Sequence, residues 1–157
     1  MGVGATAARL SLTDDRALVP FAVAQQALAK AIELNPNYLQ ARLVLADLHL
    51  KAREPDLARK QCDAVLAVAP KNPQALLIAG NVAMAEGKKE VARERFETLI
   101  ATEPENPAGY YRLGVLQRLT GDIESARGNL EKALELVNGV LEDRPHNRHS
   151  HLGVVAA

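Results

Sequence analysis

Three histidines near residue 150 are the side chains whose spacing could support metal chemistry. His146, His149 and His151 lie within the string HNRHSH, and the first two could share one helix face and bind a divalent cation. The alternative, which we favour, is a polar linker that leads into a helix. We therefore predict that the chain has no metal site and no cofactor.

The other residues with chemical potential also favour structural roles. His49 occupies a position expected to face a helical core, so a structural histidine is favoured. Cys62 is the single cysteine, which excludes an internal disulfide, and we interpret it as a small buried hydrophobic residue. The sequence contains no phosphate-binding glycine loop, no cysteine pair at zinc spacing and no G-x-S-x-G motif, and no carboxylate pair stands out for acid–base catalysis. These features predict a protein that is not an enzyme.

The composition limits the classes of partner. The chain has 157 residues with 19 basic and 19 acidic side chains, so its formal net charge is zero. Binding to nucleic acid phosphates requires a concentrated positive surface, so nucleic acid is not expected as the main partner. No apolar run approaches the roughly 18 residues of a membrane-spanning helix, and no signal peptide is visible. The compartment stays open, with the cytoplasm as the default.

Small residues recur along the chain at a constant spacing. They form two series, Ala46, Gly80 and Gly114 in the first and Ala58, Ala92 and Ala126 in the second. A fixed period of this length, about 34 residues, is typical of stacked helical repeats. Each unit is expected to form two helices, with Gly87 and Gly121 at the turn between them and Arg53 at the same place in the first unit.

Gly114 stands in the middle of a predicted helix, where glycine costs about 1 kcal/mol relative to alanine. We expect that cost to be offset by close packing against Ala126 on the following helix, because two backbones approach closely where the side chains are small. Gly80 and Ala92 are predicted to repeat this contact one unit earlier.

The pattern resembles the tetratricopeptide repeat, a helix–turn–helix unit of the same length with Leu-Gly, spaced alanines, an aromatic residue and a closing proline. The last unit matches this pattern through Tyr110, Leu113, Gly114, Ala126, Leu130 and Ala133. Arg42 departs from it where a large apolar residue is usual, and His49, Ala83 and Gln117 occupy a position that is often tyrosine. The resemblance implies an all-α fold, a right-handed α-solenoid of antiparallel helix pairs with about seven helices and no sheet.

The period also predicts the repeat boundaries within a single array that covers residues 1–157. Full repeats are expected at about residues 39–72, 73–106 and 107–140, with a preceding partial repeat at 5–38 and the start of a further repeat at about 146–157. In the last segment, Leu152-Gly153 repeats Leu113-Gly114. Because apolar residues end there without a polar capping helix, we expect the chain to be a piece of a longer array whose uncapped ends could allow self-association.

The resemblance further implies a binding surface, since the stacked first helices of such arrays line a concave groove. The side chains expected to face this groove are Gln40, Leu43, Asp47 and Leu50 in the first repeat, Gln74, Leu77, Asn81 and Met84 in the second, and Ala108, Tyr111, Val115 and Arg118 in the third. This groove is mixed, with an apolar floor. Leu43 and Asp47 stand where the family's carboxylate clamp requires lysine and asparagine, so binding to the C-terminal tails of chaperones is not expected.

These features predict a protein-interaction scaffold that holds a peptide or a helix of a partner in the groove. The alternative is a segment of a larger, bacterial multidomain enzyme or of a secretion or assembly protein, in which the repeats serve as a spacer or docking arm. In both cases the expected partner is a protein or a peptide.

Overall fold

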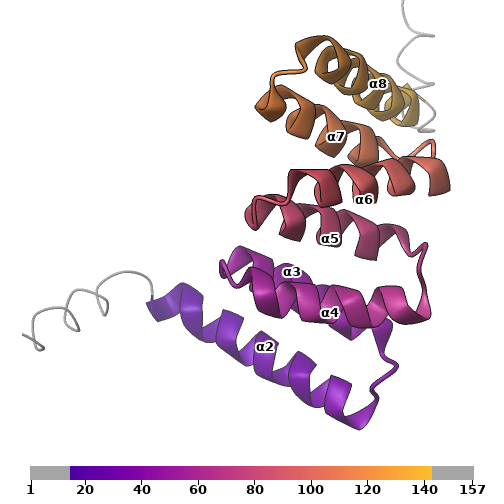
Figure 1. Ribbon diagram of the computed structural model, residues 1–157. Coiled ribbons are helices and arrows are strands. Elements are labelled where there is room, and N and C mark those ends of the chain that lie inside the picture. The colour runs from indigo at the N-terminus through magenta and orange to yellow at the C-terminus, as the bar shows by residue number, and fades with distance from the viewer. Residues whose placement is uncertain (1–14, 143–157) are drawn as a thin grey trace, which may run out of the picture. The chain divides into compact units, whose positions relative to one another are not determined.

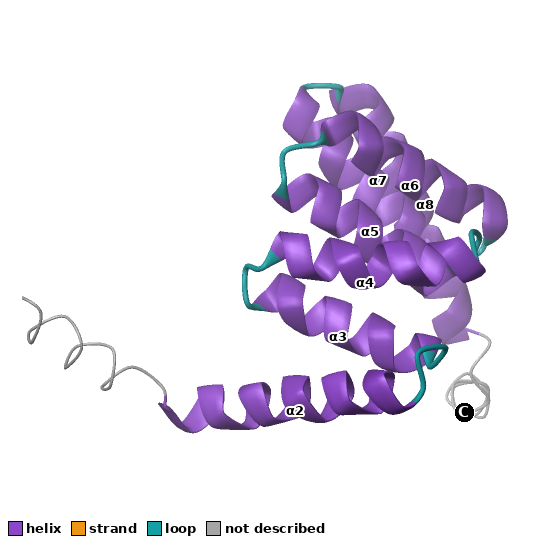
Figure 2. Cartoon of the chain, turned by 60° about the horizontal axis from the view of Figure 1, so that its bottom comes forward, coloured by secondary structure: helices purple, strands orange, loops and turns teal. Residues whose placement is uncertain are grey.

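The computed structural model describes residues 15–142, and all the regular structure in this part of the chain is helical (Figure 1). Its seven helices are α2 (Asp15–Leu34), α3 (Leu39–Lys51), α4 (Pro55–Val68), α5 (Pro73–Ala85), α6 (Lys89–Thr102), α7 (Pro107–Thr120) and α8 (Ile123–Glu142). Short loops join the helices, and no strand occurs between residues 15 and 142 (Figure 2). The predicted fold class, an all-α solenoid built from antiparallel helix pairs, is confirmed.

Two of the pairs begin at an Asn-Pro sequence that satisfies free backbone N–H groups. Asn72 Oδ1 accepts a hydrogen bond from the Ala75 N–H at 2.9 Å, and Asn106 Oδ1 accepts one from the Ala108 N–H at 3.0 Å. The proline that follows each asparagine occupies the start of the helix, where a missing N–H costs nothing. Because the starts of α3, α5 and α7 are equally spaced along the chain, the sequence period is also the period of the helix pairs.

The turns inside the pairs use a left-handed residue at the same repeat position. Gly87 has a φ of 75° and Gly121 a φ of 88°, and Arg53 takes a φ of 61° at the corresponding place in the first pair. The prediction that these three residues form the turns is confirmed. A residue with a Cβ loses roughly 1–2 kcal/mol in the left-handed region, so Arg53 carries strain that the two glycines avoid.

The chain divides into two compact units, residues 1–65 and 66–157. In the first unit α3 packs against α2. Arg42 of α3 forms hydrogen bonds with α4 and with the loop that precedes α3. Arg42 Nη1 donates a hydrogen bond to Gln61 Oε1 of α4 at 2.9 Å, and its Nε donates to the Pro36 carbonyl at 3.0 Å. These bonds explain how this position holds a charged residue where the repeat pattern usually has an apolar one.

Polar residues also link helices at the repeat position that is often tyrosine. His49 Nδ1 lies 3.3 Å from Gln25 Nε2 of α2 and 2.7 Å from Glu54 Oε2. Two repeats later, Gln117 Oε1 of α7 accepts a hydrogen bond from Asn129 Nδ2 of α8 at 2.7 Å. The departures from the repeat pattern at these two positions therefore replace a tyrosine by hydrogen bonds between neighbouring helices.

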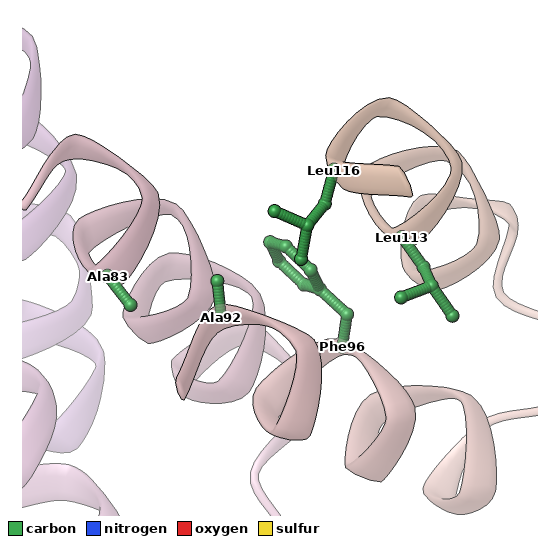
Figure 3. Close-up of a cluster of buried hydrophobic side chains, with 5 residues drawn as sticks. All are labelled: Ala83, Ala92, Phe96, Leu113 and Leu116. Atoms are coloured by element: carbon green, nitrogen blue, oxygen red, sulfur yellow. The ribbon is translucent and has the colours of Figure 1, made fainter. Parts of the chain in front are cut away.

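The second unit contains the pairs α5–α6 and α7–α8, and its core includes the contact between α6 and α7 (Figure 3). The buried cluster consists of Ala83, Ala92, Phe96, Leu113 and Leu116, and Leu77, Met84 and Ile100 pack on its rim. Figure 3 shows the ring of Phe96 on α6 beside the side chain of Leu116 on α7. Because Phe96 is fully buried, this ring has little room to move when a neighbour grows.

Two mid-helix glycines lie where the helices of a pair meet. A Cβ on Gly114 would lie 3.1 Å from the Ala126 carbonyl oxygen and 2.8 Å from Leu130 Cγ, so the predicted packing of Gly114 against Ala126 is confirmed. At Gly80 the three atoms nearest to the missing Cβ belong to the ring of Phe96, with Cδ1 at 2.7 Å, so the contact of Gly80 with Ala92 stays a prediction. An aromatic ring fills the space in the second repeat that a leucine fills in the third.

Several predicted features lie outside the described residues. These are the cluster of His146, His149 and His151, the beginning of the partial repeat at 5–38 and the start of a further repeat at 146–157. The helix expected near the end of that partial repeat is α2. Within residues 15–142, no helix combines the length and the apolar character needed to cross a membrane.

Candidate functional site

The predicted groove residues of α3 lie in different environments. Gln40 is exposed, and Asp47 is half-buried with its carboxylate 2.5 Å from Lys51 Nζ. Leu43 is only 2% exposed and therefore offers no surface to a partner. The same repeat position is half-buried at Leu77 and half-exposed at Tyr111, so the second unit is the better candidate for an apolar contact surface.

The predicted groove residues of α5 form one stripe along the helix. Leu77, Asn81 and Met84 follow the i, i+4, i+7 spacing of a single helix face, and all three are half-buried. Leu77 and Met84 pack against the buried cluster that contains Phe96, whereas Gln74, at the start of α5, is exposed. The structure therefore places Asn81 between two apolar side chains at the edge of the core.

Asn81 has an unsatisfied polar group. Its Oδ1 atom is buried and has no hydrogen-bond partner among the described residues. A buried acceptor without a partner costs about 1–3 kcal/mol, which is why most buried polar groups in proteins are paired. Rotation about χ2 exchanges Oδ1 and Nδ2, so the amide can present either an acceptor or two donors. Asn81 therefore holds hydrogen-bonding capacity that the described part of the chain does not use.

The predicted groove residues of α7 are more accessible. Tyr111 is 50% exposed, Val115 is half-buried and Arg118 is exposed. The guanidinium carbon of Arg112 lies 5.7 Å from the centre of the Tyr111 ring, a cation–π contact that restrains the ring. Tyr111 thus presents a large, restrained aromatic surface to solvent.

Tyr111 also lines an apolar hollow of about 540 Å³ between α7 and α8. The residues around this α7/α8 hollow are Pro107, Ala108 and Tyr111 from α7 and Leu130, Ala133, Leu134 and Val137 from α8. Leu134 is 60% exposed and Val137 is 43% exposed, so large apolar side chains meet solvent here. Clustered apolar surface of this kind typically marks an interaction site.

The α8 side of this hollow is absent from the residues predicted from the sequence. Leu130, Leu134 and Val137 follow the i, i+4, i+7 spacing of one helix face, and this spacing was the available signal. Leu130 and Ala133 match repeat positions that belong to the core. That match does not reveal that the same face continues along α8 into solvent.

His49 and Cys62, two side chains with chemical potential, lie in structural surroundings. Within residues 15–142, no group of three His, Cys, Asp or Glu side chains could hold a metal ion. His49 is held by its contact with Glu54, as expected for a structural histidine. Cys62 is fully buried, and this burial, together with the nearby Asp63 carboxylate, raises the pKa of its thiol to about 12. The interpretation of Cys62 as a buried hydrophobic residue is confirmed, since so high a pKa suppresses the reactive thiolate.

Comparisons with known proteins agree with this architecture. Two family models of the tetratricopeptide repeat match the chain, one over residues 21–80 and the other over residues 77–148. No curated protein matches it.

Solved structures of MamA share the fold. MamA 41-end from Desulfovibrio magneticus RS-1 has a TM-score of 0.70 at 24% identity, over 78% of this chain and 69% of that one. A MamA RS-1 ArsTM double mutant has a TM-score of 0.71 at 24% identity, over 80% of this chain and 71% of that one. A further crystal structure of MamA has a TM-score of 0.69 at 21% identity, over 80% and 74% of the two chains. At these identities the likeness concerns the fold alone.

Proposed function

Because the chain belongs to the tetratricopeptide repeat family, we propose that it is a non-enzymatic scaffold that holds a peptide or helix of a partner protein along α5 and α7. Repeat arrays of this kind use extended surfaces for binding. Helices α5 and α7 contact each other within the second unit, so side chains from both can meet one ligand. The proposed contacts are Leu77 and Asn81 on α5 and Tyr111 and Val115 on α7.

The observation that supports this proposal is the buried Oδ1 atom of Asn81, which has no hydrogen-bond partner among the described residues. A polar group beside an apolar core lowers stability unless it gains a partner, so its presence is accounted for if a ligand supplies the hydrogen bond. The backbone of a bound peptide offers both N–H donors and C=O acceptors. Asn81 would therefore bind any peptide sequence through its backbone, and the apolar neighbours would select its side chains.

The apolar part of the surface supports the same proposal. Leu77 and Val115 are half-buried and keep some surface for a ligand, while Tyr111 is 50% exposed. Tyrosine is a frequent anchor in interfaces because it buries a large area with few rotatable bonds. A peptide that buries one or two hydrophobic side chains beside Tyr111 fits this surface.

The test begins with peptides selected from a random display library against the full chain. The tightest peptide is labelled, and its dissociation constant is measured by fluorescence polarisation. Asn81→Ala is expected to weaken binding by about five- to tenfold, the value of one hydrogen bond. It should leave the melting temperature unchanged or raise it, because the buried Oδ1 atom makes no hydrogen bond in the free protein. Tyr111→Ala is expected to weaken binding by about thirtyfold.

Glu97→Ala is the matched control, because Glu97 is exposed on α6, outside the proposed surface. It should leave the dissociation constant unchanged. Since the four proposed contacts carry no charge, binding should also change little with salt. Peptides that bind Asn81→Ala and Tyr111→Ala as tightly as the original chain, or that dissociate on modest addition of salt, would contradict the proposal. The role of a spacer or docking arm in a larger protein would then be favoured.

A further inference from the structure

Met84 stands at the edge of the proposed peptide-binding surface, one helix turn after Asn81. Both residues belong to the half-buried stripe of α5, and Met84 packs against the buried cluster that contains Phe96 (Figure 3). Side chains in a helix lean back toward its N-terminus, so the Met84 side chain is directed toward the turn that carries Asn81. Residues three apart on a helix have Cβ atoms about 5–6 Å apart, a separation that a flexible methionine side chain can span.

The two sulfur atoms within residues 15–142 differ in their access to solvent. Cys62 is fully buried, whereas Met84 is half-buried. A thioether needs no deprotonation before it reacts with hydrogen peroxide, so access to solvent is the main requirement. In this reaction a sulfur lone pair attacks one peroxide oxygen, the O–O bond breaks and an S–O bond forms. The second oxygen takes both protons and leaves as water, and the sulfur, oxidised by two electrons, becomes a sulfoxide.

Oxidation of Met84 places a polar oxygen, a hydrogen-bond acceptor, beside the amide of Asn81. The Oδ1 atom of Asn81 is buried and has no partner among the described residues. Rotation about χ2 brings Nδ2 to this position, and its N–H groups then donate to the sulfoxide oxygen. The amide that is open to a ligand in the reduced chain is thereby occupied within the chain. The sulfoxide also replaces apolar surface with a polar group at the edge of the peptide-binding surface.

We propose that Met84 is a site of reversible oxidation whose sulfoxide binds the amide of Asn81 and thereby weakens peptide binding. This inference rests on the proposed function, because it concerns the regulation of the same surface. Methionine sulfoxide reductases reverse the change: two thiols supply the electrons, form a disulfide, and the sulfoxide oxygen leaves as water. Met84 thus couples the affinity for a peptide to the supply of peroxide.

The test compares the full chain before and after treatment with hydrogen peroxide, with mass spectrometry to confirm that Met84 is oxidised. The ligand is a labelled peptide selected against the full chain that contains no methionine or cysteine. Oxidation should raise its dissociation constant by about five- to tenfold, the value of one hydrogen bond, and methionine sulfoxide reductase should restore the original value. The helical circular dichroism signal should stay unchanged. If Met84 stays reduced at a dose that oxidises methionine in a free peptide, or if oxidation unfolds the chain, the proposal is overturned.

Met84→Leu is the matched control, because leucine has a similar volume and no sulfur. Peroxide should leave its affinity for the peptide unchanged, which also controls for oxidation of Met1 and Cys62. In Asn81→Ala the amide is gone, so oxidation should change the dissociation constant by less than about twofold. Equal affinities of the oxidised and reduced original chain, or a full loss of affinity on oxidation of either variant, would overturn the proposal.

A second measurement does not need a peptide. The side-chain amide signals of Asn81 in a nitrogen–proton correlation NMR spectrum are identified by their loss in Asn81→Ala. They should shift when the original chain is oxidised, and they should not shift when Met84→Leu is treated in the same way. Unmoved signals in the oxidised original chain would overturn the proposal. Peptides that bind Asn81→Ala as tightly as the original chain would instead contradict the proposed function, and its regulation with it, whether or not the signals shift.

Discussion

Arg53 adopts a backbone conformation that glycine holds at the two equivalent turns, with a φ of 61°. Glycine at this position would remove roughly 1–2 kcal/mol of strain but would make the unfolded chain more flexible. We therefore expect Arg53→Gly to raise the free energy of unfolding by about 0.5–1 kcal/mol, as measured by urea denaturation. Gly121→Ala is the reciprocal change, and it should lower the free energy of unfolding by about 1 kcal/mol because its φ is 88°. If Arg53→Gly instead lowers the free energy of unfolding, the contacts of the arginine side chain stabilise the fold by more than its backbone strain destabilises it.

The raised pKa of Cys62 leads to a prediction for stability at high pH. The thiol has a pKa of about 12 in the folded protein because it is buried, with a further contribution from Asp63, against an ordinary value of 9.0. The folded chain keeps a proton there that the unfolded chain loses. The contribution of Cys62 to stability is therefore complete below pH 9 and is lost as the pH rises from 9 to about 12.

Urea denaturation of the original chain and of Cys62→Ala across this range provides the measurement. The original chain should lose stability more steeply than the variant, by up to about 1.4 kcal/mol per pH unit. The variant is the control for tyrosine and lysine groups that titrate over the same range. Parallel pH profiles of the two proteins would mean that the thiol is not shielded from water in the folded state.

At the scale of elements, the packing of α6 against its neighbours depends on small residues. Ala92 is fully buried in the cluster with Phe96 and Leu116. Leucine at this position would overpack the cluster, so we expect Ala92→Leu to cost about 1–3 kcal/mol of stability. Ala101→Leu on the same helix is the control, and it should change stability by less than about 0.5 kcal/mol because Ala101 is exposed. Equal melting temperatures of the two variants would contradict the packing of the cluster.

The sequence predicted where the helices begin and end better than it predicted how they pack. Helix starts depend on local features, such as the Asn72 side chain and the proline after it, and these can be read from neighbouring residues. The sequence did not predict that the ring of Phe96 fills the space beside Gly80. Close contacts depend on the rotation of two helices about their axes and on side-chain rotamers, which a repeat period does not specify.

At the scale of the whole molecule, the balance of charges restricts the kind of partner. Since 19 basic and 19 acidic side chains cancel, the chain lacks the excess positive charge that attracts phosphates. We expect no binding of a fluorescent single-stranded oligonucleotide at micromolar protein and low salt, where electrostatic binding is strongest. Fluorescence anisotropy provides the measurement. A clear rise in anisotropy that disappears at higher salt would indicate a basic surface that the net charge conceals.

The sequence by itself determined the helical class, the repeat period, the turn positions and the family, because each depends on residue types at fixed spacing. It also identified Asn81 and Tyr111 as candidate contacts from their repeat positions. Only the tertiary structure showed that Leu43 is buried, that Oδ1 of Asn81 has no partner among the described residues, and that Tyr111 shares a hollow with Leu134. Equivalent repeat positions have the same helix phase but different neighbours, and the neighbours decide whether a side chain is covered, unsatisfied or open to a partner.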